Sequence, residues 1–205
     1  MRAISLLIFA KPPRIGLSKT RLAEGVGRAE ARRIASFTLA STLRAARASG
    51  LNVRVYTTPD NLAATLQGRA VFGGLPVYPQ GPGTLTERLE RGLSEAPPGR
   101  VLFIGADAPD ITPGLLRSAV RGLTHHDAVF GPALDGGFWL FGMHKGPQTR
   151  SPFRGVRWSG PHAMEDVWSQ LPDAARVWLL PPLIDIDSAP DWGSWRMARR
   201  KSHRK

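Results

Sequence analysis

Short apolar segments alternate with amphipathic helical segments through most of this chain, and this alternation limits the folds it can adopt. Residues 4–10 and 101–104 are apolar runs of strand length, which is typical of strands buried on both faces. Residues 29–49 repeat apolar side chains every three or four positions and predict a helix. Strands that alternate with helices predict one three-layer α/β sandwich with a mainly parallel sheet. Further strands are expected at 51–58, 75–78, 128–130, 138–142 and 177–180, and further helices at 59–68, within 80–95, at 113–123, at 162–171 and after Ser188.

Length and composition limit the class of protein. At 205 residues the chain is long enough for one domain with a hydrophobic core; we place this domain at residues 1–195 and a basic tail at 196–205. The chain has no cysteine, which excludes disulfides, cysteine-bound zinc, iron–sulfur clusters and thiol nucleophiles. Residues 4–10 are too few to span a bilayer and lack the features of an export signal, so we expect a cytoplasmic protein with no membrane span.

The formal net charge is +12, and half of this excess lies in the last ten residues. Six of the 28 Lys and Arg residues fall between Arg196 and Lys205, where no acidic residue offsets them. A basic arm can bind nucleic acid, but such an arm is more often the solvated end of a helix. We therefore do not expect nucleic acid to be a partner, although a non-catalytic nucleic-acid-binding protein is a rival hypothesis.

The first expected strand leads into a loop rich in proline and cations. A buried strand that opens into a glycine-containing basic loop ahead of a helix is a common way to hold phosphates, because the helix N-terminus and the lysines converge there. The loop is not a P-loop, since the pattern G-x-x-x-x-G-K-[ST] would need glycine at Pro13 and Ser18. Spacing alone leaves open a phosphate clamp of another architecture and an ordinary basic surface loop. The loop contains Lys11, Arg14, Gly16, Lys19 and Arg21.

Acidic residues follow two of the expected strands where each strand ends. Asp107 comes directly after the strand at 101–104, and Asp185 and Asp187 lie beyond the strand at 177–180. Ligands of an open parallel sheet bind outside the carboxyl ends of its strands. Two aspartates that face a basic loop are what a divalent metal needs to bridge a polyphosphate. Asp107 could instead cap the next helix, and Asp187 could simply close a turn.

The segment Asp135-Gly136-Gly137 has the composition of a tight turn between two strands. The two glycines would also let the backbone approach a bound substrate while Asp135 accepts a hydrogen bond from it. A hairpin connection and a substrate contact are compatible, so both hypotheses stand.

Five motifs in this order resemble those of a bacterial family of unknown function. Its members are described as glycosyltransferase-A-like, or selenodomain-associated, transferases, and the match extends over residues 4–192. The opening loop and the motif that begins at Gly105 are also distantly similar to phospholactate guanylyltransferase and molybdenum cofactor guanylyltransferase. The motifs are Phe9-Ala-Lys-Pro-Pro-Arg-Ile-Gly-Leu-Ser-Lys-Thr-Arg-Leu22, Gly105-Ala-Asp-Ala-Pro109, Gly131-Pro-Ala-Leu-Asp-Gly-Gly-Phe138, Trp158-Ser159 and Asp185-Ile-Asp-Ser188.

The resemblance implies a glycosyltransferase-A fold that uses Mg²⁺ or Mn²⁺ to hold a nucleoside triphosphate or a nucleotide sugar. By the family pattern Asp107 and Asp187 would bind the metal, and Asp107 and Asp135 would be catalytic. Asp135 and its two glycines would line the acceptor side. The residues that would contact the nucleotide are Lys11, Gly16, Lys19, Arg21, Arg88, Gly136 and Gly137.

The chain departs from that family pattern in one motif. The family tends to have Gly-Asp-Leu-Gly before Glu-Arg, whereas this chain has Gly83-Thr84-Leu85-Thr86 before Glu87-Arg88. Threonines thus replace an acidic residue and a glycine, which weakens any assignment of an acceptor or base contact to this loop. Arg88 is retained.

These features lead to one main hypothesis and two rivals. We expect a metal-dependent transferase that moves a sugar from a nucleotide sugar to a small-molecule acceptor, with Asp135 as the base near the acceptor hydroxyl. The first rival keeps the fold but joins a nucleoside triphosphate to a phosphorylated small molecule and releases pyrophosphate. The second rival is the nucleic-acid-binding protein. The sequence leaves the nucleobase, the acceptor and the oligomeric state open, a dimer included.

Overall fold

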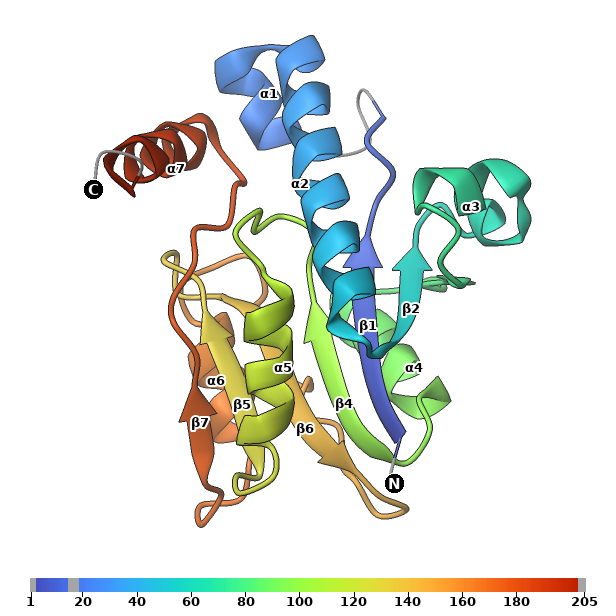
Figure 1. Cartoon of the computed structure of the whole chain (residues 1–205). Coiled ribbons are helices and arrows are strands. Elements are labelled where there is room, and N and C mark those ends of the chain that lie inside the picture. The colour runs from blue at the N-terminus through green and yellow to red at the C-terminus, as the bar shows by residue number, and fades with distance from the viewer. Residues whose placement is uncertain (1–2, 15–18, 203–205) are drawn as a thin grey trace.

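The computed structural model describes residues 3–14 and 19–202, which form a seven-stranded sheet with helices on both faces (Figure 1). The strands are β1 (Ala3–Ala10), β2 (Asn52–Thr57), β3 (Val77–Pro79), β4 (Gly99–Ile104), β5 (Ala128–Pro132), β6 (Phe138–Lys145) and β7 (Val177–Leu179). Their order across the sheet is β3-β2-β1-β4-β6-β5-β7. Strand β6 runs antiparallel to both of its neighbours, and the other neighbouring pairs are parallel. The prediction of a mainly parallel sheet is confirmed.

Helices cover both faces of the sheet and complete the predicted three-layer sandwich. Helices α2 (Arg28–Ser49) and α5 (Pro113–Gly122) lie on one face, and α4 (Leu85–Glu95) and α6 (Ala163–Ser169) lie on the other (Figure 1). A 3₁₀ helix (Asp60–Ala64) and helix α3 (Leu66–Val71) follow β2. These elements match the expected segments, with boundaries that shift by a few residues.

Each side of the sheet has its own hydrophobic core, because neighbouring residues of a strand point to opposite faces. Leu6 and Ile8 of β1 are fully buried in the core beneath α2 and α5. Leu7, which lies between them, is fully buried in the core beneath α4 and α6. Burial on both faces explains why the central strands are continuous apolar runs in the sequence.

Helix α1 (Thr20–Val26) differs from the prediction, because its residues were expected to belong to the basic loop. The helix has only seven residues and contains Gly25, so its intrinsic helix propensity is low. Tertiary contacts stabilise it instead. Leu22 is fully buried in a third cluster with Ile34 of α2 and Trp195 of helix α7 (Ala189–Ser202). A Cβ on Gly25 would lie 2.5 Å from the Cβ of Ala189, so α1 and α7 are in close contact there.

Helix α7 is fixed to the rest of the domain by an aspartate that no sequence motif marked for this purpose. Asp110 follows β4, and its carboxylate accepts hydrogen bonds from Trp195 Nε1 at 2.8 Å and from Arg199 Nη1 at 3.1 Å. The ring of Trp195 also stacks on Trp192, with 5.1 Å between the centroids. The helix continues through Arg196 to Ser202, and the division into a domain and a tail stays a prediction.

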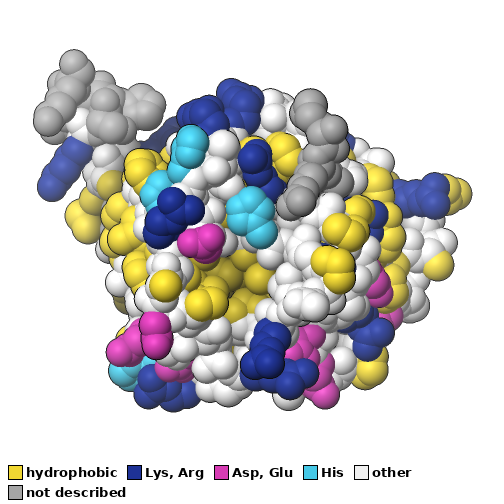
Figure 2. All heavy atoms as spheres, turned by 90° about the horizontal axis from the view of Figure 1, so that it is seen from below, with side chains coloured by type: hydrophobic (Ala, Val, Ile, Leu, Met, Phe, Trp, Pro, Cys, Tyr) yellow, Lys and Arg dark blue, Asp and Glu magenta, His cyan; other side chains and the backbone are white. Residues whose placement is uncertain are grey.

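The end of the molecule at the amino ends of the parallel strands has a surface of mixed charge. Figure 2 shows Lys and Arg side chains on this face dispersed among Asp, Glu, His and hydrophobic side chains. The basic excess of the chain therefore does not form one continuous patch among the described residues of this face. Within residues 3–14 and 19–202, no helix combines the length and the apolar character that crossing a membrane requires.

We expect Asp110→Ala to lower the free energy of unfolding by about 1–3 kcal/mol, because the indole N–H of Trp195, a residue only 8% exposed, would lose its acceptor. Urea unfolding measures the change. Asp173→Ala is the matched control, since it removes the same charge from an exposed position. Equal unfolding midpoints for the two variants would show that Asp110 does not hold α7 in place.

Candidate functional site

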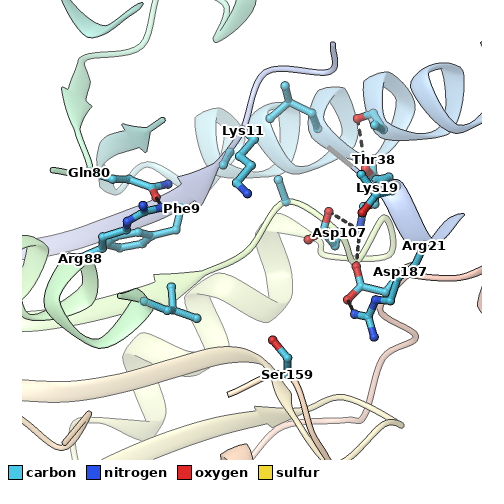
Figure 3. Close-up of a pocket in the computed structure, with 16 residues that line it drawn as sticks. Phe9, Lys11, Lys19, Arg21, Thr38, Gln80, Arg88, Asp107, Ser159 and Asp187 are labelled. Carbon is cyan, nitrogen blue, oxygen red and sulfur yellow. Dashed lines mark hydrogen bonds and ion pairs between the residues drawn. The ribbon is translucent and has the colours of Figure 1, made fainter. Parts of the chain in front are cut away.

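A cavity of about 560 Å³ opens at the carboxyl ends of β1 and β4 (Figure 3). Phe9, Ala10 and Lys11 line it from the end of β1, and Ala106 and Asp107 line it from the loop after β4. Helices α1, α2 and α4 and the segment before α7 contribute the other walls. This is the edge at which open parallel sheets bind their ligands, as the sequence analysis expected.

Lys19 lies between the two aspartates that the sequence marked as metal ligands. Its Nζ is 2.6 Å from Oδ1 of Asp107 and 2.6 Å from Oδ1 of Asp187, and it donates to the backbone carbonyl of Ile186 at 2.5 Å. Arg21 Nη2 lies 2.9 Å from the other carboxylate oxygen of Asp187. All three ammonium protons of Lys19 therefore have an oxygen partner. The Lys19 side chain is only 6% exposed, whereas the side chains of Asp107 and Asp187 are 39% and 34% exposed, so the ammonium is shielded from water and the carboxylates remain in contact with it.

The loops that carry the two aspartates are joined by a backbone hydrogen bond. Ile186 N donates to the carbonyl of Asp107 at 3.1 Å, and the side chain of Ile186 is fully buried beneath α1, α2 and α7. On the other side of Asp187, the carboxylate of Asp191 accepts from the backbone N–H of Asp187 at 3.2 Å and from that of Ser188 at 2.8 Å. Asp187 is thus held between a buried residue and the first turn of α7.

The charged groups of this cluster shift one another's pKa. Burial alone would lower the pKa of Lys19, but Asp107 and Asp187 outweigh burial and raise it, so the ammonium stays charged. Burial would raise the pKa of Asp187, but Lys19 and Arg21 outweigh burial and lower it. Burial, followed by the charge of Asp107, raises the pKa of Asp185 well above its usual range. The cluster is a concentration of carboxylates in which Lys19 is the main counter-charge.

The donor atoms present fit a divalent metal that takes part of its coordination from a substrate. Asp107 and Asp187 already direct carboxylate oxygens at one cationic atom, Lys19 Nζ. Mg²⁺ commonly binds proteins through one or two carboxylates together with substrate phosphates. Among residues 3–14 and 19–202, no three His, Cys, Asp or Glu side chains form a group that could hold a metal. Two carboxylates suit a metal that arrives with a phosphate better than a permanently bound one.

The opposite end of the cavity combines an aromatic ring with hydrogen-bonding groups. In Figure 3, Phe9, Gln80 and Arg88 lie together, away from the Lys19 cluster, and the amine of Lys11 points into the cavity between them. Gln80 Nε2 donates to the carbonyl of Tyr56 at 3.0 Å, and Gln80 Oε1 accepts from Arg88 Nη1 at 3.4 Å. Arg88 Nε is buried without a hydrogen-bond partner in the described part of the chain. Arg88 itself lines the cavity, so its side chain can contact a ligand there.

Asp135, Gly136 and Gly137 form the predicted turn, and they do not line the cavity. Asp135 Oδ1 accepts from Gly137 N at 3.0 Å in the connection between the antiparallel strands β5 and β6, which confirms the hairpin. Gly136 has φ of 88°, and a Cβ there would lie 2.3 Å from the carbonyl oxygen of Pro161, so packing also requires glycine. The charge of Asp135 contributes to the raised pKa of Asp185, which places it near the site. Its role toward a substrate stays a prediction.

The two threonines that depart from the family pattern have structural roles. Thr84 is the N-cap of α4 and forms a capping box, a role that aspartate also fills well. Thr86 Oγ1 donates to the carbonyl of Phe153 at 3.1 Å and accepts from Trp158 Nε1 at 2.9 Å. Thr86 therefore ties α4 to the loop that carries Ser159, a cavity residue with φ of 62°.

The structure brings most of the expected site residues together and adds several cavity residues that were not among them. Gln80 follows β3 directly, so the rule that ligands bind at strand carboxyl ends could have found it. Phe9 and Ser159 belong to two of the five family-like motifs, but neither residue was among the expected site residues. Gly16 lies outside the described residues. The expected residues that line the cavity are Lys11, Lys19, Arg21, Arg88, Asp107 and Asp187, and the additional ones include Phe9, Thr38, Gln80, Leu85 and Ser159.

The chain shares its fold with a solved structure described as a nucleotide-diphospho-sugar transferase, which confirms the fold that the motifs implied. The chain belongs to the DUF2064 family, described as "uncharacterized protein conserved in bacteria", whose model matches residues 39–160. No curated protein sequence matches the chain.

Solved structures with the same fold include transferases. One described as a "putative nucleotide-diphospho-sugar transferase", from Desulfovibrio desulfuricans G20, is 26% identical with a TM-score of 0.81, over 95% of this chain and 87% of that one. A 4-diphosphocytidyl-2C-methyl-D-erythritol synthase from Anaerococcus prevotii is 12% identical with a TM-score of 0.60, and the match covers 93% of this chain and 94% of that one. A manganese complex of Rv0371c from Mycobacterium tuberculosis is 18% identical with a TM-score of 0.54, and the match covers 94% of this chain and 97% of that one. At these identities the last two show the fold alone.

We expect Asp187→Asn and Asp185→Asn to change the free energy of unfolding in opposite directions at pH 7. The pKa of Asp187 is lowered by folding, so its carboxylate stabilises the fold above the unfolded pKa, and this contribution is lost as the pH falls through the folded pKa. The pKa of Asp185 is raised by folding, so its protonated carboxyl stabilises the fold. This stabilisation is fully present below the unfolded pKa and is lost as the pH rises through the folded pKa. Asparagine should therefore destabilise at position 187 and stabilise at position 185.

Urea unfolding with a chelator at pH 7 and at pH 3 measures both effects. At pH 3, below the ordinary aspartate pKa of about 3.9, the free energy of unfolding of each variant should differ less from that of the unsubstituted protein than it does at pH 7. Changes of the same sign at pH 7 would contradict this account of the cluster.

Proposed function

We propose that this chain is a metal-dependent transferase that acts on an activated nucleotide, and that the nucleotide is a nucleotide sugar whose glycosyl group is transferred. The observation that carries the proposal is the meeting of Asp107 and Asp187 with Lys19 and Arg21 in one cavity at the carboxyl edge of the sheet. Reactions at a phosphate need positioning and charge neutralisation more than covalent chemistry. Carboxylates for a metal beside cations for phosphates provide both.

The two ends of the cavity suit the two parts of a nucleotide. Phosphates would lie at the end formed by Lys19 and Arg21, and Asp107 and Asp187 would hold a Mg²⁺ or Mn²⁺ ion. When bound, such an ion neutralises the charge that develops on the departing phosphate oxygens. At the other end, Phe9 and Arg88 would contact the nucleoside. Asp135, exposed at the same edge of the sheet, would accept the proton of the acceptor hydroxyl.

A nucleotidyltransferase is the second candidate. The fold likeness to the Anaerococcus prevotii cytidyl-transfer enzyme supports it, while the higher identity of the Desulfovibrio protein supports the use of a nucleotide sugar. Both reactions would use the same cations and carboxylates, and they differ in which phosphorus or carbon atom is attacked.

Nucleic-acid binding by the basic end of α7 receives less support. Arg199 donates to Asp110, and its guanidinium lies 5.4 Å from the centroid of Trp195. The guanidinium of Arg196 lies 5.9 Å from the centroid of Trp192. These two cations contact their own helix and domain, as expected for the solvated end of a packed helix.

We expect nucleotide sugars to raise the Tm of the protein in the presence of Mn²⁺, because a ligand that binds the folded state stabilises it by mass action. A thermal-shift panel of nucleotide sugars, nucleoside diphosphates and nucleoside triphosphates measures this, with Mn²⁺ alone and each nucleotide with EDTA as controls. If only nucleoside triphosphates raise the Tm, the result would favour nucleotidyl transfer over the proposed glycosyl transfer. No stabilisation by any nucleotide would refute the proposed function.

We expect Asp107→Asn to remove most of the metal dependence of nucleotide binding. Mutation of a residue that only hydrogen-bonds to a metal ligand lowers metal affinity by about 10- to 100-fold. Loss of a ligand itself should therefore weaken Mn²⁺-dependent nucleotide binding by at least about tenfold. Calorimetry with the best nucleotide of the panel measures this with Mn²⁺ and with EDTA. The control is Asp173→Asn, an exposed acid before β7 at the other end of the sheet. Unchanged Mn²⁺-dependent binding in Asp107→Asn would show that the metal site is elsewhere.

A further inference from the structure

The ammonium of Lys19 occupies the point at which the two aspartates converge. It has three oxygen partners, supplied by Asp107, Asp187 and the carbonyl of Ile186, at 2.5 to 2.6 Å. Its side chain is drawn back from solvent, with only 6% exposed, although the residue lines the cavity. Lys19 also has φ of 57°, a left-handed conformation that is uncommon for a residue other than glycine and often accompanies functional sites.

A divalent metal and this ammonium cannot use the same oxygens at the same time. Mg²⁺ and similar ions need oxygens about 2.0–2.6 Å away, and Oδ1 of Asp107 and Oδ1 of Asp187 already lie 2.6 Å from Lys19 Nζ. A dication placed beside the ammonium would also repel it, because the two positive charges would lie close together between the same carboxylates. Lys19 must therefore leave before a metal can bind between Asp107 and Asp187.

Departure of the lysine has a cost that a metal alone does not offset. The ammonium would lose its ion pair with Asp107 and its hydrogen bonds to Asp187 and to the carbonyl of Ile186, and two carboxylates would supply only part of the coordination of the metal. A phosphate group offsets both losses. It adds oxygen ligands that complete the coordination of the metal, and it gives the freed ammonium a new anionic partner. Arg21 can remain in place throughout, since it pairs with Oδ2 of Asp187 and is 63% exposed.

We propose that Lys19 and the metal occupy this site in turn. In the nucleotide-free protein Lys19 neutralises Asp107 and Asp187, and a metal–nucleotide complex displaces it as one unit, after which the ammonium binds the phosphates. The inference rests on the proposed function and deepens it: the substrate is the metal complex of the nucleotide, and free metal is a weak ligand. Lys19 thereby keeps the aspartates from capturing a metal without substrate.

The test measures Mn²⁺ binding without any nucleotide, by the electron paramagnetic resonance signal of free Mn²⁺. Lys19→Met should bind Mn²⁺ at least about tenfold more tightly than the unsubstituted protein, because the competing cation is gone. The matched control is Arg21→Met, which removes one positive charge from the same cluster but not from between the carboxylates. Its effect should stay below about threefold, since an exposed charge is screened by solvent and salt. No gain for Lys19→Met, or an equal gain for Arg21→Met, would overturn the proposal.

A second measurement on the unsubstituted protein decides the question if Lys19→Met does not fold. Inorganic pyrophosphate is the probe: calorimetry should show that its Mn²⁺ complex binds at least about tenfold more tightly than Mn²⁺ alone or pyrophosphate alone. Mn²⁺ binding that is equally tight without pyrophosphate would overturn the proposal. Failure of the proposed function would give a different pattern, because nucleotides would then fail to bind while Lys19→Met still gained affinity for Mn²⁺.

Discussion

The candidate site depends on one buried ammonium that neutralises two aspartates from different parts of the chain. Asp107 follows β4 and Asp187 precedes α7, and their side chains would repel each other without Lys19 between them. Removal of Lys19 would leave these two carboxylates close together without the counter-charge between them. Burial, followed by the charge of Asp107, raises the pKa of Asp185, which lies beside this cluster. Lys19 is thus the main counter-charge for a group of closely spaced carboxylates.

The framework that holds this cluster could be predicted from the sequence, since it follows from local patterns. Apolar runs such as 4–10 and 101–104 can be buried on both faces only in the middle of a sheet. Thr112 and Pro113 mark the start of α5 through capping chemistry that acts within one turn, and Thr112 does accept from Leu115 N at 3.1 Å. The positions of Asp107 and Asp187 at strand ends then place them at one edge.

What the sequence could not predict are the contacts between segments far apart in the chain. Helix α1 has weak intrinsic propensity and exists because Leu22 is buried against α2 and α7. Lys19 pairs with Asp187, which lies 168 positions away in the chain, and also with Asp107, and no sequence spacing rule predicts contacts of this kind. The same holds for Asp110, whose bonds to Trp195 and Arg199 arise only once α7 is packed.

The contacts of Thr84 and Thr86 explain what these residues do in place of the acidic residue and the glycine of the family pattern. Thr84 keeps the cap of α4 that an aspartate would form, without the charge of an aspartate. Thr86 adds a hydroxyl that bridges Phe153 and Trp158, which a glycine could not do. Thr84 is not among the residues that line the cavity, whereas the loop that Thr86 fixes presents Ser159 to it. The two threonines therefore preserve the start of α4 and hold one wall of the cavity in position, which are structural roles that a motif comparison alone does not reveal.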